Sequence, residues 1–320
     1  MMKQDYYLAT IALPLGLGGY VAILTNILFA IKYEMWSELL KQTISTEFGK
    51  SLNFDKIKQQ GDMMGKIFYI CSFISVLVTA IFKLLTEKTC LRSNFGRNEI
   101  CGVLLVAWIP SGLADSVVYK RCVFLHQLLS FWTIIAFTEI LNIQYQICNL
   151  IDDKIKHTAW MFNKINTAGT PTLQYQQFSF CIKYHQYILK LCEYFDNTSR
   201  KTMGHVTLST SVVMSFLLYN GMKGNYSLLC YGGNYLLNLA FMCHTGQKLE
   251  DAMSKLGAFI YLSRWYECCS EIRKAVPLVI LRSQRLVGLQ AVPIGRLNYI
   301  LFFMVMKTTY TYLNLMKNTE

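Results

Sequence analysis

The sequence predicts an all-α, polytopic membrane protein: a bundle of helices that crosses the bilayer six times. Of its 320 residues, 53% are hydrophobic and only 16% are charged, whereas about 25% are charged in an average soluble domain. Aromatic residues make up 14%, which excludes intrinsic disorder. Finally, six apolar runs have the length of about 20 residues that a helix needs to cross the hydrocarbon core of a bilayer.

The predicted spans are residues 8–31, 67–85, 122–148, 203–222, 226–247 and 289–316. A shorter apolar run at 100–114 contains Pro110 and predicts an interfacial or re-entrant segment. Glu139 is the lone charge inside the third span. It is either a functional group or a structural carboxylate with a partner.

Three stretches between the spans carry charges and apolar residues at helical spacing, so we expect helices that continue beyond the membrane. Residues 32–66, 146–201 and 248–285 together contain 20 lysines and arginines, against 8 in the alternate loops and termini. The excess places these three stretches in the cytoplasm of a multi-pass plasma-membrane protein, with the C-terminus extracellular. The basic residues form no block, so no nucleic-acid partner is expected.

The spans and loops divide the chain into three parts. Residues 1–245 form a transmembrane helical bundle with a ligand pocket, 246–287 form cytoplasmic anchor helices, and 288–320 form the last span and an extracellular C-terminus. No GxSxG, HExxH or Walker sequence occurs, and the five histidines are scattered. Neither an enzyme, a metal site nor a cofactor is therefore expected. Most of the eleven cysteines lie in apolar segments and are interpreted as small buried hydrophobic residues.

Polar residues of the last predicted span recur on one helical face: Arg296, Tyr299, Lys307, Thr311, Asn314 and Asn318. A single polar face on a membrane helix indicates that this face borders an aqueous pathway. The alternative is that the stripe packs against another helix through hydrogen bonds. A ring of Lys307 side chains would repel cations, so this lysine alternatively reaches the interface or pairs with an acid.

Aromatic side chains gather in the predicted outer halves of several spans: Tyr20, Phe82, Phe131, Trp132, Phe216, Tyr219, Tyr231 and Tyr235. Such a set predicts an apolar pocket in which a few hydroxyl groups orient a small ligand. An interfacial aromatic belt or ordinary packing of the bundle is the alternative.

The C-terminal sequence resembles the insect odorant receptor family through residues in a characteristic order: Gly246, Leu249, Glu250, Trp265, Tyr266, Arg282, Ser283, Gln284, Phe303, Val305, Lys307, Tyr310 and Tyr312. Upstream, KYEMWSELLKQ leading to GDMMGKIFY resembles the first cytoplasmic loop and third span of that family. The resemblance covers nearly the whole chain and is specific in its last eighty residues. It matches 8–31 to the second of seven family spans, so we expect the first span to be missing.

The resemblance implies an odorant-gated, non-selective cation channel of olfactory sensory neurons. In this family an odorant-specific subunit binds a small volatile odorant and assembles with the odorant receptor co-receptor as a hetero-tetramer. The last helix lines the pore, which implies that Lys307 and Thr311 face it and that a narrow gate lies near Asn314 and Leu315. The odorant pocket of the family lies among the outer halves of earlier spans, where Tyr20, Phe82, Phe131, Trp132, Phe216, Tyr219 and Tyr235 are the candidates.

Other classes fit the residues less well. A gustatory receptor channel of the same superfamily is matched in part by Thr311 and Tyr312, and a truncated, non-functional receptor is a further alternative. A G-protein-coupled receptor is disfavoured because no DRY or NPxxY sequence occurs. A secondary transporter would use paired interior charges and broken helices, for which only Glu139 and Lys307 are available.

Overall fold

The computed structural model is an almost entirely helical bundle and describes residues 2–48, 54–93, 116–165, 169–224, 226–284 and 287–318. Its elements are α1 (Met2–Ile31), α2 (Tyr33–Ile44), α3 (Phe54–Ser93), α4 (Val117–Lys164), α5 (Pro171–Met222), α6 (Ser227–Leu262), the 3₁₀ helix η2 (Trp265–Glu267), α7 (Ser270–Ser283), β1 (Gln290–Ala291), β2 (Gly295–Arg296) and α8 (Tyr299–Asn318). The all-helical fold class predicted from the apolar runs is confirmed. The predicted segment 100–114 lies outside the described residues.

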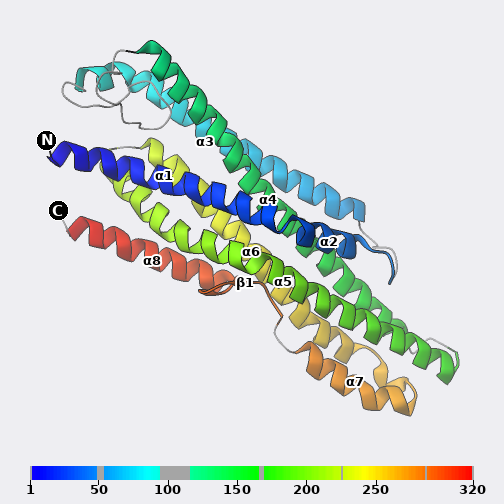
Figure 1. Cartoon of the computed structure of the whole chain (residues 1–320). Helices are drawn as coiled ribbons and strands as arrows, with labels where there is room; N and C mark the ends of the chain where they lie inside the picture. The colour runs from blue at the N-terminus through cyan, green and yellow to red at the C-terminus, as the bar shows by residue number, and fades with distance from the viewer. Residues whose placement is uncertain are drawn as a thin grey trace.

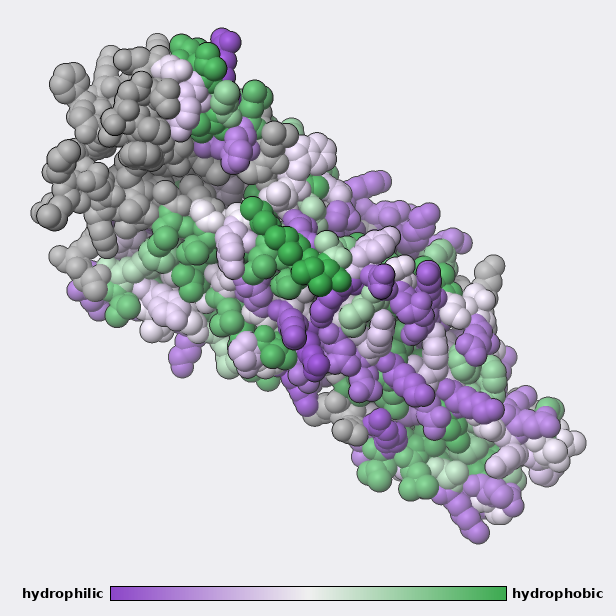
Figure 2. Space-filling view, viewed as in Figure 1, coloured by the Kyte–Doolittle hydropathy of each residue, from purple (hydrophilic) through white to green (hydrophobic). Residues whose placement is uncertain are grey.

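The bundle is elongated, and both ends of the chain lie at the same end of it (Figure 1). The opposite end holds α7 together with the adjoining ends of α4, α5 and α6, which belong to the stretches 146–201 and 248–285 that are rich in lysine and arginine. On the face shown in Figure 2, hydrophilic residues become more frequent toward that end. The segregation of charge predicted from the sequence therefore corresponds to two ends of one molecule.

The long helices begin where the sequence supplies a capping group. The Ser116 side chain accepts a hydrogen bond from the backbone N–H of Tyr119, and α4 continues from there for 48 residues. Thr170 accepts from the N–H of Leu173, and Pro171 occupies the first turn of the 52-residue α5. Proline suits this position because the first N–H groups of a helix have no intrahelical partner. Both helices extend well past the predicted spans, as expected for helices that continue beyond the membrane.

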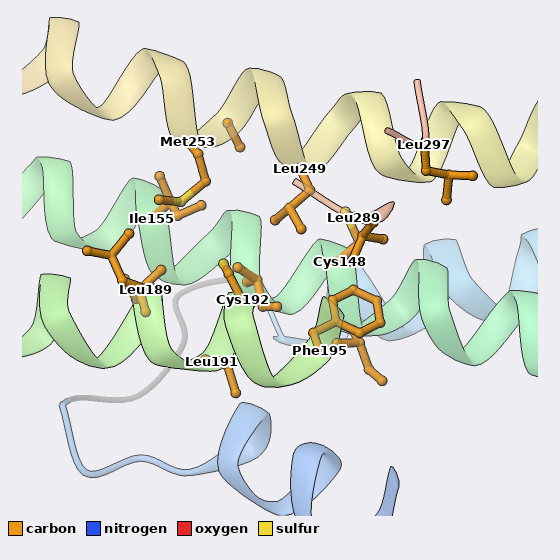
Figure 3. Packing of buried hydrophobic residues seen from close by; sticks show 14 of the residues in the cluster. Cys148, Ile155, Leu189, Leu191, Cys192, Phe195, Leu249, Met253, Leu289 and Leu297 are labelled. Atoms are coloured by element: carbon orange, nitrogen blue, oxygen red, sulfur yellow. The ribbon is translucent and has the colours of Figure 1, made fainter. Parts of the chain in front are cut away.

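The main hydrophobic core lies where α4, α5 and α6 run side by side (Figure 3). Buried side chains of these helices point toward one another: Cys148 and Ile155 from α4, Leu189 and Cys192 from α5, and Leu249 and Met253 from α6. Five of the nine described free cysteines are buried, in agreement with their interpretation as small hydrophobic residues. Trp36 of α2 joins the core with 1% of its surface exposed.

The segment around α2 is tied to α4 and α5 by hydrogen bonds of lysine and tyrosine side chains. Lys32 Nζ donates hydrogen bonds to the backbone oxygens of Thr198 at 2.7 Å and Asn197 at 3.1 Å on α5. Lys154 Nζ of α4 donates to the Ser45 oxygen at 2.9 Å, and the Tyr187 hydroxyl of α5 donates to the Gln42 oxygen at 2.6 Å. These contacts fix the bend between α1 and α2.

The predicted last span differs from the structure at its start. Residues 289–298 form the β1–β2 hairpin, and α8 begins only at Tyr299. The prediction of a helix from Leu289 is therefore wrong. Pro293 lacks a backbone N–H, and glycine at 295 has a positive φ of 151°, so this apolar stretch cannot continue as a helix. The boundary expected at 245/246 also falls inside a continuous helix, because α6 runs unbroken to Leu262.

The hairpin packs against two helical glycines. A Cβ atom on Gly204 of α5 would lie 2.6 Å from the carbonyl carbon of Val292, closer than real Cβ atoms come. A Cβ atom on Gly246 of α6 would lie 2.9 Å from the carbonyl carbon of Leu297. The Val292 N–H donates to the Arg200 oxygen at 3.2 Å. The backbone of the hairpin thus contacts both helices directly and sets the start of α8.

Two described helical segments are long and apolar enough to cross a membrane, Phe54–Phe82 and Val117–Lys164, and Gly16–Ile31 with Tyr33–Ile44 forms a third candidate bent by 68°. The three other predicted spans overlap α5, α6 and α8. Helix α5 is rich in hydroxyl groups, which lowers its hydropathy. Thr207 and Thr210 donate to the backbone oxygens of Met203 and Val206, so these hydroxyls are satisfied within the helix.

Candidate functional site

A cavity of about 520 Å³ lies among α1, α3, α4 and α6. Its described lining residues are Gly18, Val21 and Ala22 of α1; Tyr69, Ile70, Ser72, Phe73 and Ser75 of α3; Ile134, Ile135 and Phe137 of α4; and Tyr231, Asn234, Tyr235 and Asn238 of α6. The lining is mostly apolar, and none of these side chains is charged. This volume falls within the range of about 300–1,000 Å³ that small-molecule sites occupy.

Polar groups of the cavity come from two facing helices. Asn234 and Asn238 are one turn apart on α6, and Ser72 and Ser75 are three residues apart on α3. Asn234 Nδ2 lies 3.5 Å from Ser72 Oγ, which joins the two helices at the cavity wall. The amide oxygens of both asparagines and the Ser75 hydroxyl are buried and have no hydrogen-bond partner among the described residues.

The residues predicted for the pocket lie in different surroundings. Tyr235 lines the cavity. Tyr20 is 56% exposed and meets the His205 ring edge-to-face at 6.0 Å, and Trp132 is 68% exposed. Phe82 lies in the C-terminal half of α3 and is partly buried. Phe131 belongs to α4, and its side chain is not among those that the structure describes.

The two predicted pocket residues on α5 lie away from this cavity. Phe216 is half-buried, and Tyr219 is buried with Lys223 Nζ 4.6 Å from the centre of its ring. No residue of α5 is among the described residues that line the cavity. Among the described side chains, Tyr235 of the seven candidates lines the cavity, and Tyr231 of the same aromatic set lines it as well.

Sequence reasoning missed the polar part of the lining. Asn234 and Asn238 stand four residues apart in a predicted span without charges, and this spacing places them on one helical face. This pair of amides was the sequence signal for a polar patch in the cavity wall, because an amide inside a membrane helix is uncommon and needs a hydrogen-bond partner.

Glu139, the lone interior charge of its span, has a partner. Its carboxylate is hydrogen-bonded to the hydroxyl of Tyr69, which also lines the cavity. The structural alternative considered for this residue is therefore the one that the contacts favour.

Helix α8 presents two different faces. Leu301, Val305 and Thr309 are buried, and the Thr309 hydroxyl lies 3.4 Å from the backbone oxygen of Ser211 on α5. Lys307 and Thr311 are exposed. Since positions two residues apart differ by about 200° around a helix, these polar residues point away from α5.

The ends of the predicted polar stripe behave differently. Leu315 is exposed and Asn314 is half-buried. Arg296 precedes the helix and lies 3.6 Å from the Glu250 carboxylate. The Tyr299 hydroxyl and His244 Nδ1 share a hydrogen bond of 2.8 Å. The part of the stripe centred on Lys307 and Thr311 is exposed, and the Thr311 hydroxyl donates to the Lys307 oxygen within α8 at 3.0 Å.

The charged end of the bundle contains buried ionisable groups. Burial lowers the pKa of His185, which is 2% exposed, and the guanidinium of Arg282 lowers it further. Burial also lowers the pKa of His157 and of Lys154, although the carboxylate of Asp153 acts in the opposite direction on both. Histidines held neutral in this way make the folded state less stable when the pH falls.

The sequence model of the 7tm Odorant receptor family matches residues 36–310. The chain belongs to this odorant receptor family. Within it, Odorant receptor 67c of Drosophila melanogaster is 21% identical over 142 residues, which cover 43% of this chain and 35% of that receptor. The chain thus matches about a third of the length of this relative.

Solved structures of an insect olfactory receptor share the fold. The receptor OR5 from Machilis hrabei in complex with eugenol superimposes with a TM-score of 0.77 at 10% identity, over 98% of this chain and 82% of that one. A second structure of the same receptor gives a TM-score of 0.75 at 11% identity, over 94% and 78%. The resemblance to insect odorant receptors expected from the C-terminal residues is confirmed.

Two residues of the odorant receptor signature contact the hairpin in front of α8. Gly246 receives the hairpin that precedes α8, and Glu250, one turn later, pairs with Arg296 of the same hairpin. Both residues join α6 to the start of α8.

Proposed function

We propose that this chain is the odorant-binding subunit of a heteromeric, odorant-gated, non-selective cation channel in the plasma membrane of olfactory sensory neurons. Membership of the odorant receptor family is the first support. The observation that carries the proposal is the uncharged, mostly apolar cavity enclosed by α1, α3, α4 and α6, because a small volatile molecule requires such a site. The partner is the odorant receptor co-receptor, in a hetero-tetramer.

In this proposal α8 lines the pore, with Lys307 and Thr311 on the water-filled side and the narrowest point near Asn314 and Leu315. The exposure of Lys307 and Thr311 opposite the face buried on α5 supports the assignment. Six spans cross the bilayer in α1, α3, α4, α5, α6 and α8. The end with α2 and α7 is cytoplasmic, and the C-terminus is extracellular.

Ligand binding opens the channel only if the odorant has a higher affinity for the open arrangement than for the closed one. Helix α6 offers a direct connection between cavity and pore. It carries Asn234 and Asn238 at the cavity, and eight residues after Asn238 it carries Gly246, which contacts the hairpin in front of α8. A small displacement of α6 at the cavity therefore reaches the base of the pore helix.

The experiment is to record membrane current in cells that express this chain with an insect co-receptor, across a broad odorant panel and against the co-receptor alone. We expect an odorant-evoked cation current that the control lacks. Ala22→Phe fills the cavity from α1 and is expected to abolish the response. Ala30→Phe, on an exposed position of the same helix, is the matched control and is expected to respond normally. Normal responses of Ala22→Phe would contradict the assignment of the cavity.

A further inference from the structure

The cavity has a polar strip that its other walls lack. Asn238 is 7% exposed, Ser75 is also 7% exposed, and both line the cavity from opposite helices. The oxygens Asn238 Oδ1, Asn234 Oδ1 and Ser75 Oγ have no hydrogen-bond partner among the described residues. These atoms lie beside one cavity and leave several hydrogen-bonding groups there unsatisfied. A buried polar group without a partner destabilises the protein, so it favours a ligand that satisfies it.

We propose that the ligand of this cavity is a neutral, mostly apolar molecule with one hydroxyl group, an alcohol or a phenol, which hydrogen-bonds to Asn234 and Asn238. The inference rests on the proposed function, since it names the class of odorant for the same site. It goes beyond that function because it follows from the particular side chains of this cavity.

The two asparagines select a hydroxyl group by its chemistry. Each side-chain amide has an oxygen that accepts and an NH₂ group that donates, and a hydroxyl does both. The two amides lie on one face of α6, one helical turn apart, so one oxygen atom of a ligand is able to contact both. Rotation about the last torsion of an asparagine is broad, which lets the amide oxygen turn toward the cavity at little cost.

The absence of charged side chains among the described lining residues further restricts the class of ligand. The described lining contains no lysine, arginine, histidine, aspartate or glutamate. Burying an ionised carboxylate or ammonium group without an opposite charge is strongly unfavourable. The cavity therefore excludes organic acids and amines in their charged forms. The remaining walls, formed by residues such as Val21, Ile134 and Phe137, accommodate an aliphatic or aromatic body.

The test measures affinities of the purified full chain in lipid nanodiscs for three probes that share a phenylethyl group: 2-phenylethanol, its methyl ether and ethylbenzene. We expect the alcohol to bind about tenfold more tightly than ethylbenzene, with the ether, which only accepts, in between. Asn234→Leu/Asn238→Leu replaces both amides with apolar groups of similar size and is expected to reverse the order. Ile135→Val, which removes a lining methylene but no polar atom, is expected to keep it.

The outcomes separate this inference from the proposed function. Equal or tighter binding of ethylbenzene by the unaltered chain overturns the hydroxyl class, and this comparison requires no variant to fold. Absence of binding by all three probes overturns it as well. The predicted order of affinities without any evoked current supports the ligand class but counts against the channel function. A current evoked equally by all three probes supports the channel and overturns the ligand class.

Discussion

Replacing Gly204 with alanine is expected to force the β1–β2 hairpin away from α5. The added Cβ would lie 2.6 Å from the carbonyl carbon and 2.9 Å from the amide nitrogen of Val292, where ordinary contact begins near 3.4 Å. These obstructing atoms belong to the backbone, so no side-chain rotation relieves the overlap. The hairpin must shift as a unit, and α8 follows it because only a few residues separate them.

The magnitude follows from the contacts that such a shift removes. Inserting a methyl group into a packed contact costs about 1–3 kcal/mol. The hydrogen bond from the Val292 N–H to the Arg200 oxygen is worth about 1 kcal/mol, and the bond of 2.7 Å from the Gln290 N–H to the Asp196 carboxylate about 1.5–3 kcal/mol. Partial loss of these contacts predicts a total destabilisation of about 2–5 kcal/mol.

The assay is thermal unfolding of the purified chain in one detergent, for Gly204→Ala and for Gly233→Ala. Gly233 is also inside a helix, but a Cβ there meets nothing within 4 Å among the described residues. Alanine at that position is expected to stabilise the chain by about 0.5–1 kcal/mol, because glycine weakens helix interiors. An unfolding midpoint that rises equally in both variants would refute the reasoning about the hairpin contact.

Three further predictions concern other parts of the chain. Trp36→Ala empties a core position next to Phe195, at a ring-centre distance of 6.3 Å, and is expected to cost about 3–5 kcal/mol, seen as lost folded protein in size-exclusion chromatography. The pKa of His185 is lowered in the folded state, so this residue contributes stability above about pH 6.5 that is lost as the pH falls. His185→Phe is therefore expected to reduce the drop in the unfolding midpoint between pH 7.5 and pH 5.5. An unchanged drop would exclude this histidine as the cause. Lys307→Gln is expected to change the free energy of unfolding by no more than about 0.5 kcal/mol, because the side chain is exposed. It is expected to increase the cation conductance measured with the co-receptor, because a positive charge is removed from the pore, whereas the control Lys41→Gln on α2 leaves the conductance unchanged. Equal conductances of the two variants would contradict a pore position for Lys307.

The helices were predictable because each depends on local sequence. Apolar runs and 3.6-residue spacing determine where α1, α4 and α5 lie, including their continuation past the predicted spans. The start of α8 was not predicted, because Leu289, Val292 and Ile294 resemble the beginning of the apolar run that continues into α8. Pro293 and the glycine at 295 were the local signals that this stretch is not helical.

The composition of the cavity was less accessible to sequence reasoning than the helices. Aromatic residues were expected to form it, yet Trp132 is largely exposed and Tyr219 packs within α5. Which faces of α1, α3, α4 and α6 meet depends on contacts between residues far apart in the chain. One sequence contains no direct record of such pairs, and of the predicted aromatic set Tyr231 and Tyr235 are the described residues that line this cavity.

The continuity of α6 has a consequence for how this receptor tolerates change in its length. Asn238 at the cavity and Gly246 at the hairpin are separated by eight residues, about 12 Å of uninterrupted helix. Inserting one residue between them would rotate one site against the other by about 100° and separate them by a further 1.5 Å or so. A substitution in this interval changes only the contacts of one side chain, whereas an insertion or deletion changes the rotation of the cavity residues relative to Gly246. We therefore expect related receptors to differ in the identities of residues in this interval but to keep its length.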